Sequence, residues 1–156
     1  MASTDVTKSP AKEEALPGRR IIAGMLLFAA IVTVAYWVTW FSNRDLLASA
    51  NTVQYYTFEN AFPAADGWLV FSALMATIGL LRRRNWGVYW TIVAAGSGIY
   101  LGCMDVLFDL QNGIYAVKGD PSAAIVEIII NILTFGLGIT GMVWAWFAFR
   151  RMTSRG

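Results

Sequence analysis

Two aspartates near the end of a long apolar run, Asp105 and Asp109, are the first candidates for chemistry in this sequence. Residues four apart project from the same face of a helix, so the two carboxylates are expected side by side. Glu127 and Asn131 repeat this spacing in the next apolar run. Carboxylate and amide oxygens are the ligands that hard divalent cations prefer. We therefore regard Asp105, Asp109 and Glu127 as candidate metal ligands for an ion such as Ca²⁺, Mg²⁺ or Mn²⁺.

The position of the aspartate pair is unfavourable on two counts. The pair falls at the C-terminal end of its predicted helix, where the helix dipole disfavours negative charge. Like charges at i and i+4 also repel each other, by roughly 0.2–0.5 kcal/mol. A cation, a shared proton or a basic side chain such as Arg44 or Lys118 would relieve both costs. The alternative is that the carboxylates lie at the depth of the lipid headgroups, where water solvates them.

Further polar residues extend this candidate site into a pocket. Helical spacing aligns Glu59 and Asp66 on one face, and a turn after Asp109 supplies an amide and a phenol. The predicted ligand-binding residues are Glu59, Asp66, Asp105, Asp109, Asn112, Tyr115, Glu127 and Asn131. No catalytic residue is assigned.

The composition excludes several other kinds of site. The chain has no histidine and a single cysteine, Cys103, so neither a zinc site nor a haem site is expected. A hydrolase triad built on histidine is excluded for the same reason. One cysteine cannot form a disulfide within the chain.

Four long apolar runs must position these polar residues. They cover residues 21–42, 62–81, 86–110 and 122–149, and hydrophobic residues make up 57% of the sequence against 14% charged residues. A helix needs about 20 apolar residues to cross a hydrocarbon core that is ~30 Å thick. The predicted fold is therefore all-α, an antiparallel bundle of four transmembrane helices. The predicted organisation is a disordered cytoplasmic tail over residues 1–18, a transmembrane domain over 19–150 and a short cytoplasmic tail over 151–156.

The basic residues predict the orientation of the bundle. Most of the 12 lysines and arginines lie before the first run, between the second and third, or after the fourth. These residues are Lys8, Lys12, Arg19, Arg20, Arg82, Arg83, Arg84, Arg150, Arg151 and Arg155. The positive-inside rule places this side in the cytoplasm. An integral protein of the plasma or inner membrane with both termini in the cytoplasm is expected. This distribution explains the net charge of +2 without nucleic-acid binding.

Small residues on the third and fourth predicted helices indicate close packing. Gly98 and Gly102 share a face with the aspartate pair, and Gly138 and Gly141 share a face with Glu127. Glycine lets helix backbones approach each other in lipid. We expect helices to meet along these four glycines, with the carboxylates turned into the bundle rather than towards acyl chains.

These patterns leave three functional interpretations open. The first is a small membrane protein whose outward-facing acidic pocket binds a cation or a small amphiphilic ligand, alone, as a homo-oligomer or as a subunit of a larger assembly. The second is a membrane-embedded enzyme that uses the carboxylates for isomerase-like proton transfer on a lipophilic substrate. The third is a structural membrane subunit whose acids only face headgroups and water. The lipid bilayer is the one partner common to all three.

Overall fold

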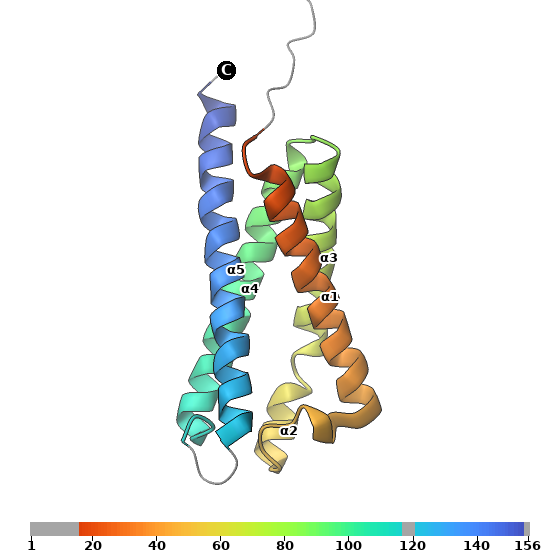
Figure 1. The fold of residues 1–156 in the computed structure, drawn as a ribbon, viewed down its shortest axis with the longest axis vertical. Coiled ribbons are helices and arrows are strands. Elements are labelled where there is room, and N and C mark those ends of the chain that lie inside the picture. The colour runs from red at the N-terminus through yellow and green to blue at the C-terminus, as the bar shows by residue number, and fades with distance from the viewer. Residues whose placement is uncertain (1–15, 117–120, 155–156) are drawn as a thin grey trace, which may run out of the picture.

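The computed structural model describes residues 16–116 and 121–154 of the chain (Figure 1). Most of the predicted N-terminal tail, residues 1–15, lies outside the described residues, as does Lys118. The helices, in chain order, are α1 Arg19–Asn43, η1 Arg44–Leu46, α2 Val53–Glu59, α3 Pro63–Leu81, α4 Trp86–Asn112 and α5 Pro121–Thr153. Four helical segments are long and apolar enough to cross a bilayer. The predicted all-α bundle of four transmembrane helices is confirmed, and the chain is an integral membrane protein.

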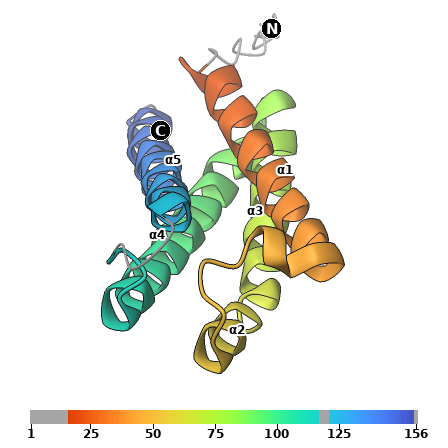
Figure 2. The same ribbon diagram turned by 60° about the horizontal axis from the view of Figure 1, so that its bottom comes forward.

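The bundle is built from two helix pairs that diverge. α1 packs along α3, α3 along α4 and α4 along α5, whereas α1 and α5 make only sparse contact. Figures 1 and 2 show the α1/α3 pair separating from the α4/α5 pair towards the end that carries α2. The short helix α2 begins after Thr52, whose hydroxyl accepts a hydrogen bond from the Tyr55 amide as an N-cap. Pro63 then opens α3 at its first position, where the missing N–H costs nothing.

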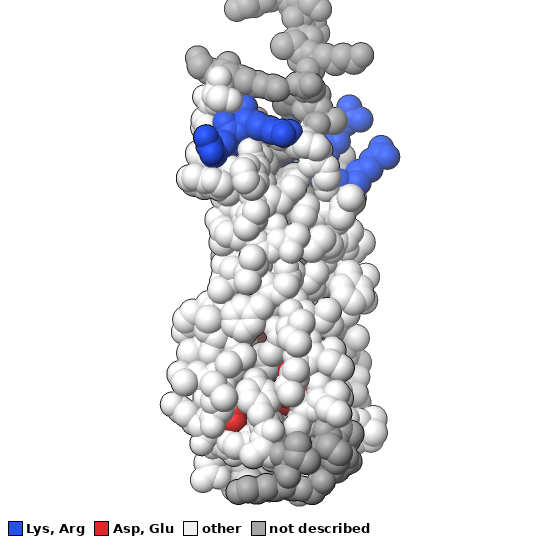
Figure 3. All heavy atoms as spheres, turned by 60° about the vertical axis from the view of Figure 1, so that its left-hand side comes forward, with Lys and Arg blue, Asp and Glu red and all other residues white. Residues whose placement is uncertain are grey.

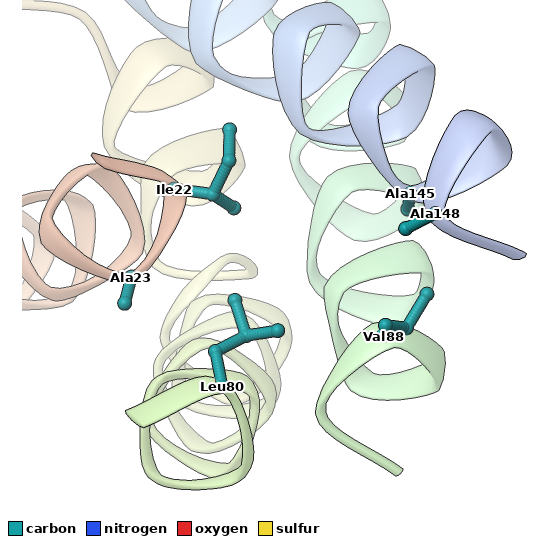
Figure 4. Packing of buried hydrophobic residues seen from close by; sticks show 6 residues of the cluster. All are labelled: Ile22, Ala23, Leu80, Val88, Ala145 and Ala148. Carbon is teal, nitrogen blue, oxygen red and sulfur yellow. The ribbon is translucent and has the colours of Figure 1, made fainter. Parts of the chain in front are cut away.

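The charged residues are distributed unevenly between the two ends. In the face shown in Figure 3, arginines lie at one end, and a few carboxylate atoms are visible in recesses of the other half. We call these the basic end and the acidic end. At the basic end all four long helices contribute to one apolar core (Figure 4), which consists of Ile22, Ala23, Leu80, Val88, Ala145 and Ala148. The Trp144 indole also donates to the Pro17 carbonyl at 2.8 Å and ties the start of α1 to α5.

Glycine contacts hold neighbouring helices close together. At the basic end, a Cβ on Gly79 would lie 2.5 Å from the Cα of Gly87, so α3 and α4 touch through their backbones. Between α4 and α5, a Cβ on Gly138 would lie 2.8 Å from Ile99, and one on Gly102 would lie 3.2 Å from Thr134. Of the remaining glycines with predicted packing roles, Gly141 faces Ala95 of α4 and Gly98 faces Leu69 of α3.

Candidate functional site

A cavity of about 180 Å³ lies between the two helix pairs in the half of the bundle that includes the acidic end, which we call the acidic half. Each of four successive helices contributes one carboxylate to its lining: Glu59 from α2, Asp66 from α3, Asp105 from α4 and Glu127 from α5. The wall formed by α1 carries Tyr36 and Trp37, and the rest of the lining includes Phe62 and several aliphatic side chains. The divergence of the helix pairs thus produces a space that is apolar in most of its surface and acidic at four points.

Three of the predicted site residues form a compact cluster at this cavity. Asp105, Asp109 and Glu127 each offer one carboxylate oxygen, and the three oxygens lie within 4.8 Å of one another. Asp109 is 1% exposed and Glu127 7% exposed, so two of the three carboxylates are buried. We call Asp105, Asp109 and Glu127 the carboxylate cluster. Its existence confirms that the acids of α4 and α5 turn into the bundle.

Asn131 packs beside the carboxylate cluster, one turn after Glu127. Its amide nitrogen donates to Asp109 Oδ2 at 3.3 Å and to the Tyr115 hydroxyl at 2.9 Å. The side chain is 5% exposed, and its oxygen Oδ1 is buried with no hydrogen-bond partner among the residues that the structure describes. The amide nitrogen of Asn131 therefore has hydrogen-bond acceptors, whereas its buried oxygen has no donor among the described residues.

Tyr115, in the turn after α4, holds Asp109 from the other side. Gly113 ends the helix in the left-handed region at φ 67°, which turns the chain back so that Tyr115 reaches the cluster. Burial and the hydrogen-bonded Asp109 carboxylate raise the pKa of Tyr115 well above its usual range. The phenol consequently stays protonated and serves as a donor to Asp109.

Glu127 receives hydrogen bonds from the segment that precedes α2. The Ser49 hydroxyl donates to Glu127 Oε1, and the Tyr55 hydroxyl donates to the same oxygen at 3.3 Å. Tyr55 is 1% exposed and accepts in turn from the Ser49 amide at 3.2 Å. Residues of the connection between α1 and α3 therefore cover the α5 side of the carboxylate cluster.

The two remaining carboxylates of the cavity are held by aromatic donors on α1. The Tyr36 hydroxyl donates to Glu59 Oε2 at 3.0 Å, and the Trp37 indole donates to Asp66 Oδ2 at 2.8 Å. These donors, like those around the carboxylate cluster, are neutral. Arg44, a predicted basic partner for the aspartates, instead lies over the Tyr56 ring with its guanidinium carbon 4.9 Å from the centroid.

The structure does not bring Asn112 to the cluster. This residue is exposed, and its side-chain amide donates to the Phe108 carbonyl of its own helix at 2.8 Å. Asparagine side chains often bond in this way to the carbonyl four residues earlier in a helix. The Asn112 side chain therefore turns back onto α4 and is not available to the cluster. The other predicted residues, Glu59, Asp66, Tyr115 and Asn131, each lie at the cavity or contact the cluster.

Sequence reasoning missed the donors that hold the carboxylates. These residues are Tyr36, Trp37, Ser49 and Tyr55. Tryptophan and tyrosine near the end of a transmembrane helix ordinarily anchor it at the membrane interface, so their positions alone do not indicate a role in the site. The available signal was the spacing of Tyr55 and Glu59, which places a phenol and a carboxylate on one face of α2.

No protein-family model matches the chain, and neither a curated protein nor a solved structure matches it.

Proposed function

We propose that this membrane protein binds a small cation in the cavity of its acidic half, either a metal ion or the ammonium group of a small amphiphile. The observation that supports the proposal is the convergence of four carboxylates from four helices on one cavity, three of which accept hydrogen bonds from neutral donors. Removing an ion from water costs several kcal/mol even after the protein relaxes. A bound cation offsets that cost for carboxylates at membrane depth, where ionisable residues most often serve function.

The remaining lining suits a ligand with an apolar part. Tyr36, Trp37 and Phe62 present aromatic surface, which attracts organic cations through the ring quadrupole. Val32 of α1 and Ile130 of α5 line the cavity and are also exposed on the surface of the bundle. An amphiphile could thus place its ammonium group among the carboxylates and its chain between the diverging helix pairs.

The cavity belongs, in this proposal, to the outer half of the membrane. The basic end carries the arginines of the α3–α4 turn and of the end of α5, and the positive-inside rule assigns such an end to the cytoplasm. A ligand would then reach the acidic half from outside the cell or from the outer leaflet.

Thermal unfolding of the purified protein in detergent tests the proposal. The melting temperature is measured with CaCl2, MgCl2 or MnCl2, with EDTA and with butylammonium chloride, each against NaCl at equal ionic strength. A ligand at 100 times its dissociation constant adds about 2.7 kcal/mol to the free energy of unfolding. The double variant Glu59→Gln/Asp105→Asn is expected to lose the response, whereas Asp45→Asn, at an exposed position in η1, keeps it. A wild-type protein that responds to none of these cations contradicts the proposal.

A further inference from the structure

We infer that the carboxylate cluster and the side-chain oxygen of Asn131 together form a binding site for a hard divalent cation, with Ca²⁺ preferred over Mg²⁺. This inference rests on the proposed function and narrows it to one ligand class and one set of atoms. Asp105 and Glu127 line the cavity, and Asp109 and Asn131 adjoin them. Glu59 and Asp66, held by α1, are not part of this site.

The spacing of the carboxylate oxygens fits one ion. The three oxygens lie within 4.8 Å of one another. Oxygen ligands on opposite sides of Ca²⁺ are about 4.6–5.2 Å apart, because each Ca–O distance is about 2.3–2.6 Å. Around Mg²⁺ the corresponding separation is only about 4.0–4.2 Å, and the geometry must be close to octahedral. The cluster can therefore surround Ca²⁺ with side-chain adjustments alone, whereas Mg²⁺ requires a tighter arrangement.

Asn131 supplies an observation that is independent of the acidic residues. Its Oδ1 atom is buried and has no partner in the described part of the chain, although a buried amide oxygen ordinarily accepts a hydrogen bond. The two amide atoms share one carbon, and the nitrogen contacts Asp109, so the oxygen belongs to a side chain that adjoins the cluster. Amide oxygens are regular Ca²⁺ ligands. A cation bound by the cluster gives Oδ1 the partner that the described residues do not provide.

The existing hydrogen bonds orient the carboxylates and leave oxygens for coordination. Ser49 and Tyr55 both donate to Glu127 Oε1, so Oε2 receives neither bond. Asn131 donates to Asp109 Oδ2 and fixes the rotation of that carboxylate. Ordered carboxylates lose less entropy when an ion binds. Ser49, Tyr55 and Tyr115 are thus positioning residues, and water in the adjoining cavity can complete the six to eight ligands that Ca²⁺ takes.

The test measures metal binding directly on the full chain in detergent. Tb³⁺ luminescence, sensitised by the nearby tyrosines, reports occupancy, and Ca²⁺ and Mg²⁺ are titrated as competitors. We expect Ca²⁺ to displace Tb³⁺ at a concentration at least about tenfold lower than Mg²⁺ does. Asp109→Asn and Asn131→Leu are each expected to lower Ca²⁺ affinity by about tenfold or more, since mutation even of residues that only support metal ligands typically costs about 10–100-fold. Asn131→Asp keeps an oxygen ligand and should retain Ca²⁺ binding, and the control Asp45→Asn, at an exposed position in η1, should stay within about threefold of wild type.

Each of the following results would contradict the inferred metal site. If the Asn131→Leu variant binds Ca²⁺ as tightly as the wild type, Asn131 is not a ligand of the cation. If Asn131→Leu does not fold, loss of Ca²⁺ binding in Asn131→Asp leads to the same conclusion. Equal loss of binding in Glu59→Gln and Asp109→Asn places the cation elsewhere in the cavity, which leaves the proposed function standing. Stabilisation by butylammonium without any divalent binding rejects only the metal site, and no response to either cation rejects both proposals.

Discussion

Tyr55 and Glu127 are 72 residues apart in the chain, and the Tyr55 hydroxyl donates to Glu127 Oε1 at 3.3 Å. Tyr55 belongs to α2, which leads into the α1/α3 pair, whereas Glu127 belongs to α5. The packing of α3 along α4 joins the two helix pairs, and this bond adds a link between α2 and α5 at the acidic end, since α1 and α5 make only sparse contact. It also orients a carboxylate of the proposed metal site. The same contact therefore contributes to the stability of the bundle and to the geometry of the cluster.

Tyr55→Phe tests this link. The substitution removes a buried hydroxyl and leaves Glu127 with one donor fewer, so the free energy of unfolding should fall by about 1–3 kcal/mol. Tyr56→Phe is the matched control, because its hydroxyl donates to Asn51 at an exposed position. Both variants are compared by thermal unfolding in the same detergent. Equal stability of the two variants would show that the Tyr55 hydroxyl does not connect the helix pairs.

Gly138→Ala should lower the stability of the α4–α5 interface. The added Cβ would lie 2.8 Å from Ile99 Cγ1 and 3.3 Å from the Ala95 carbonyl, so the Ile99 side chain or the α4 backbone must shift. Overpacking of this kind typically costs about 1–3 kcal/mol. Gly136→Ala, two residues earlier on the same helix, meets nothing within 4 Å and should be neutral or slightly stabilising. Thermal unfolding of the pair separates a steric effect from a general effect of glycine replacement.

Arg83→Gly should stabilise the α3–α4 turn. Arg83 has φ 59°, and the turn is closed by bonds from the Arg83 amide to Leu80 and from the Arg84 amide to Gly79. This is the pattern of a Schellman cap, whose left-handed position glycine occupies without strain. We expect a gain of about 0.5–1 kcal/mol, since the left-handed conformation costs other residues roughly 1–2 kcal/mol. Arg82→Gly removes the same charge at φ −79° and should not stabilise the protein.

Periodicity predicted the parts of the molecule that depend on helical geometry alone. The apolar runs indicated the four transmembrane helices, and the i, i+4 spacing of Asp105 and Asp109 with that of Glu127 and Asn131 indicated acids facing the bundle interior. The structure places these residues together because α4 and α5 pack closely along Gly102 and Gly138.

The rest of the site depends on the segments between helices, whose sequences show no repeating pattern. Ser49 reaches Glu127 because of the path of the chain between η1 and α2, which no repeating pattern encodes. The sequence does not reveal the role of Trp37, because an indole near the end of a transmembrane helix is equally typical of an anchor at the membrane interface. From the sequence, the Asn112 side chain could contact either the carboxylate cluster or a carbonyl of its own helix. In the structure it donates to the carbonyl of Phe108.

Cysteine labelling tests the orientation on which access to the cavity depends. In a Cys103→Ala background, single cysteines replace Asn51, in the connection before α2, and Asn85, in the turn before α4; both positions are exposed. Intact cells are treated with a membrane-impermeant thiol reagent before and after permeabilisation. Asn51→Cys should label in intact cells, because the acidic end is predicted to face outwards, and Asn85→Cys should label only after permeabilisation, because it adjoins the arginines of the basic end.

The reverse labelling pattern would show that the bundle has the opposite orientation, with the acidic cavity on the cytoplasmic side. The metal site itself would be unaffected by that result, but its ligand would then come from the cytoplasm, where free Ca²⁺ is scarce enough that only a site with the micromolar affinity of a sensor would be filled.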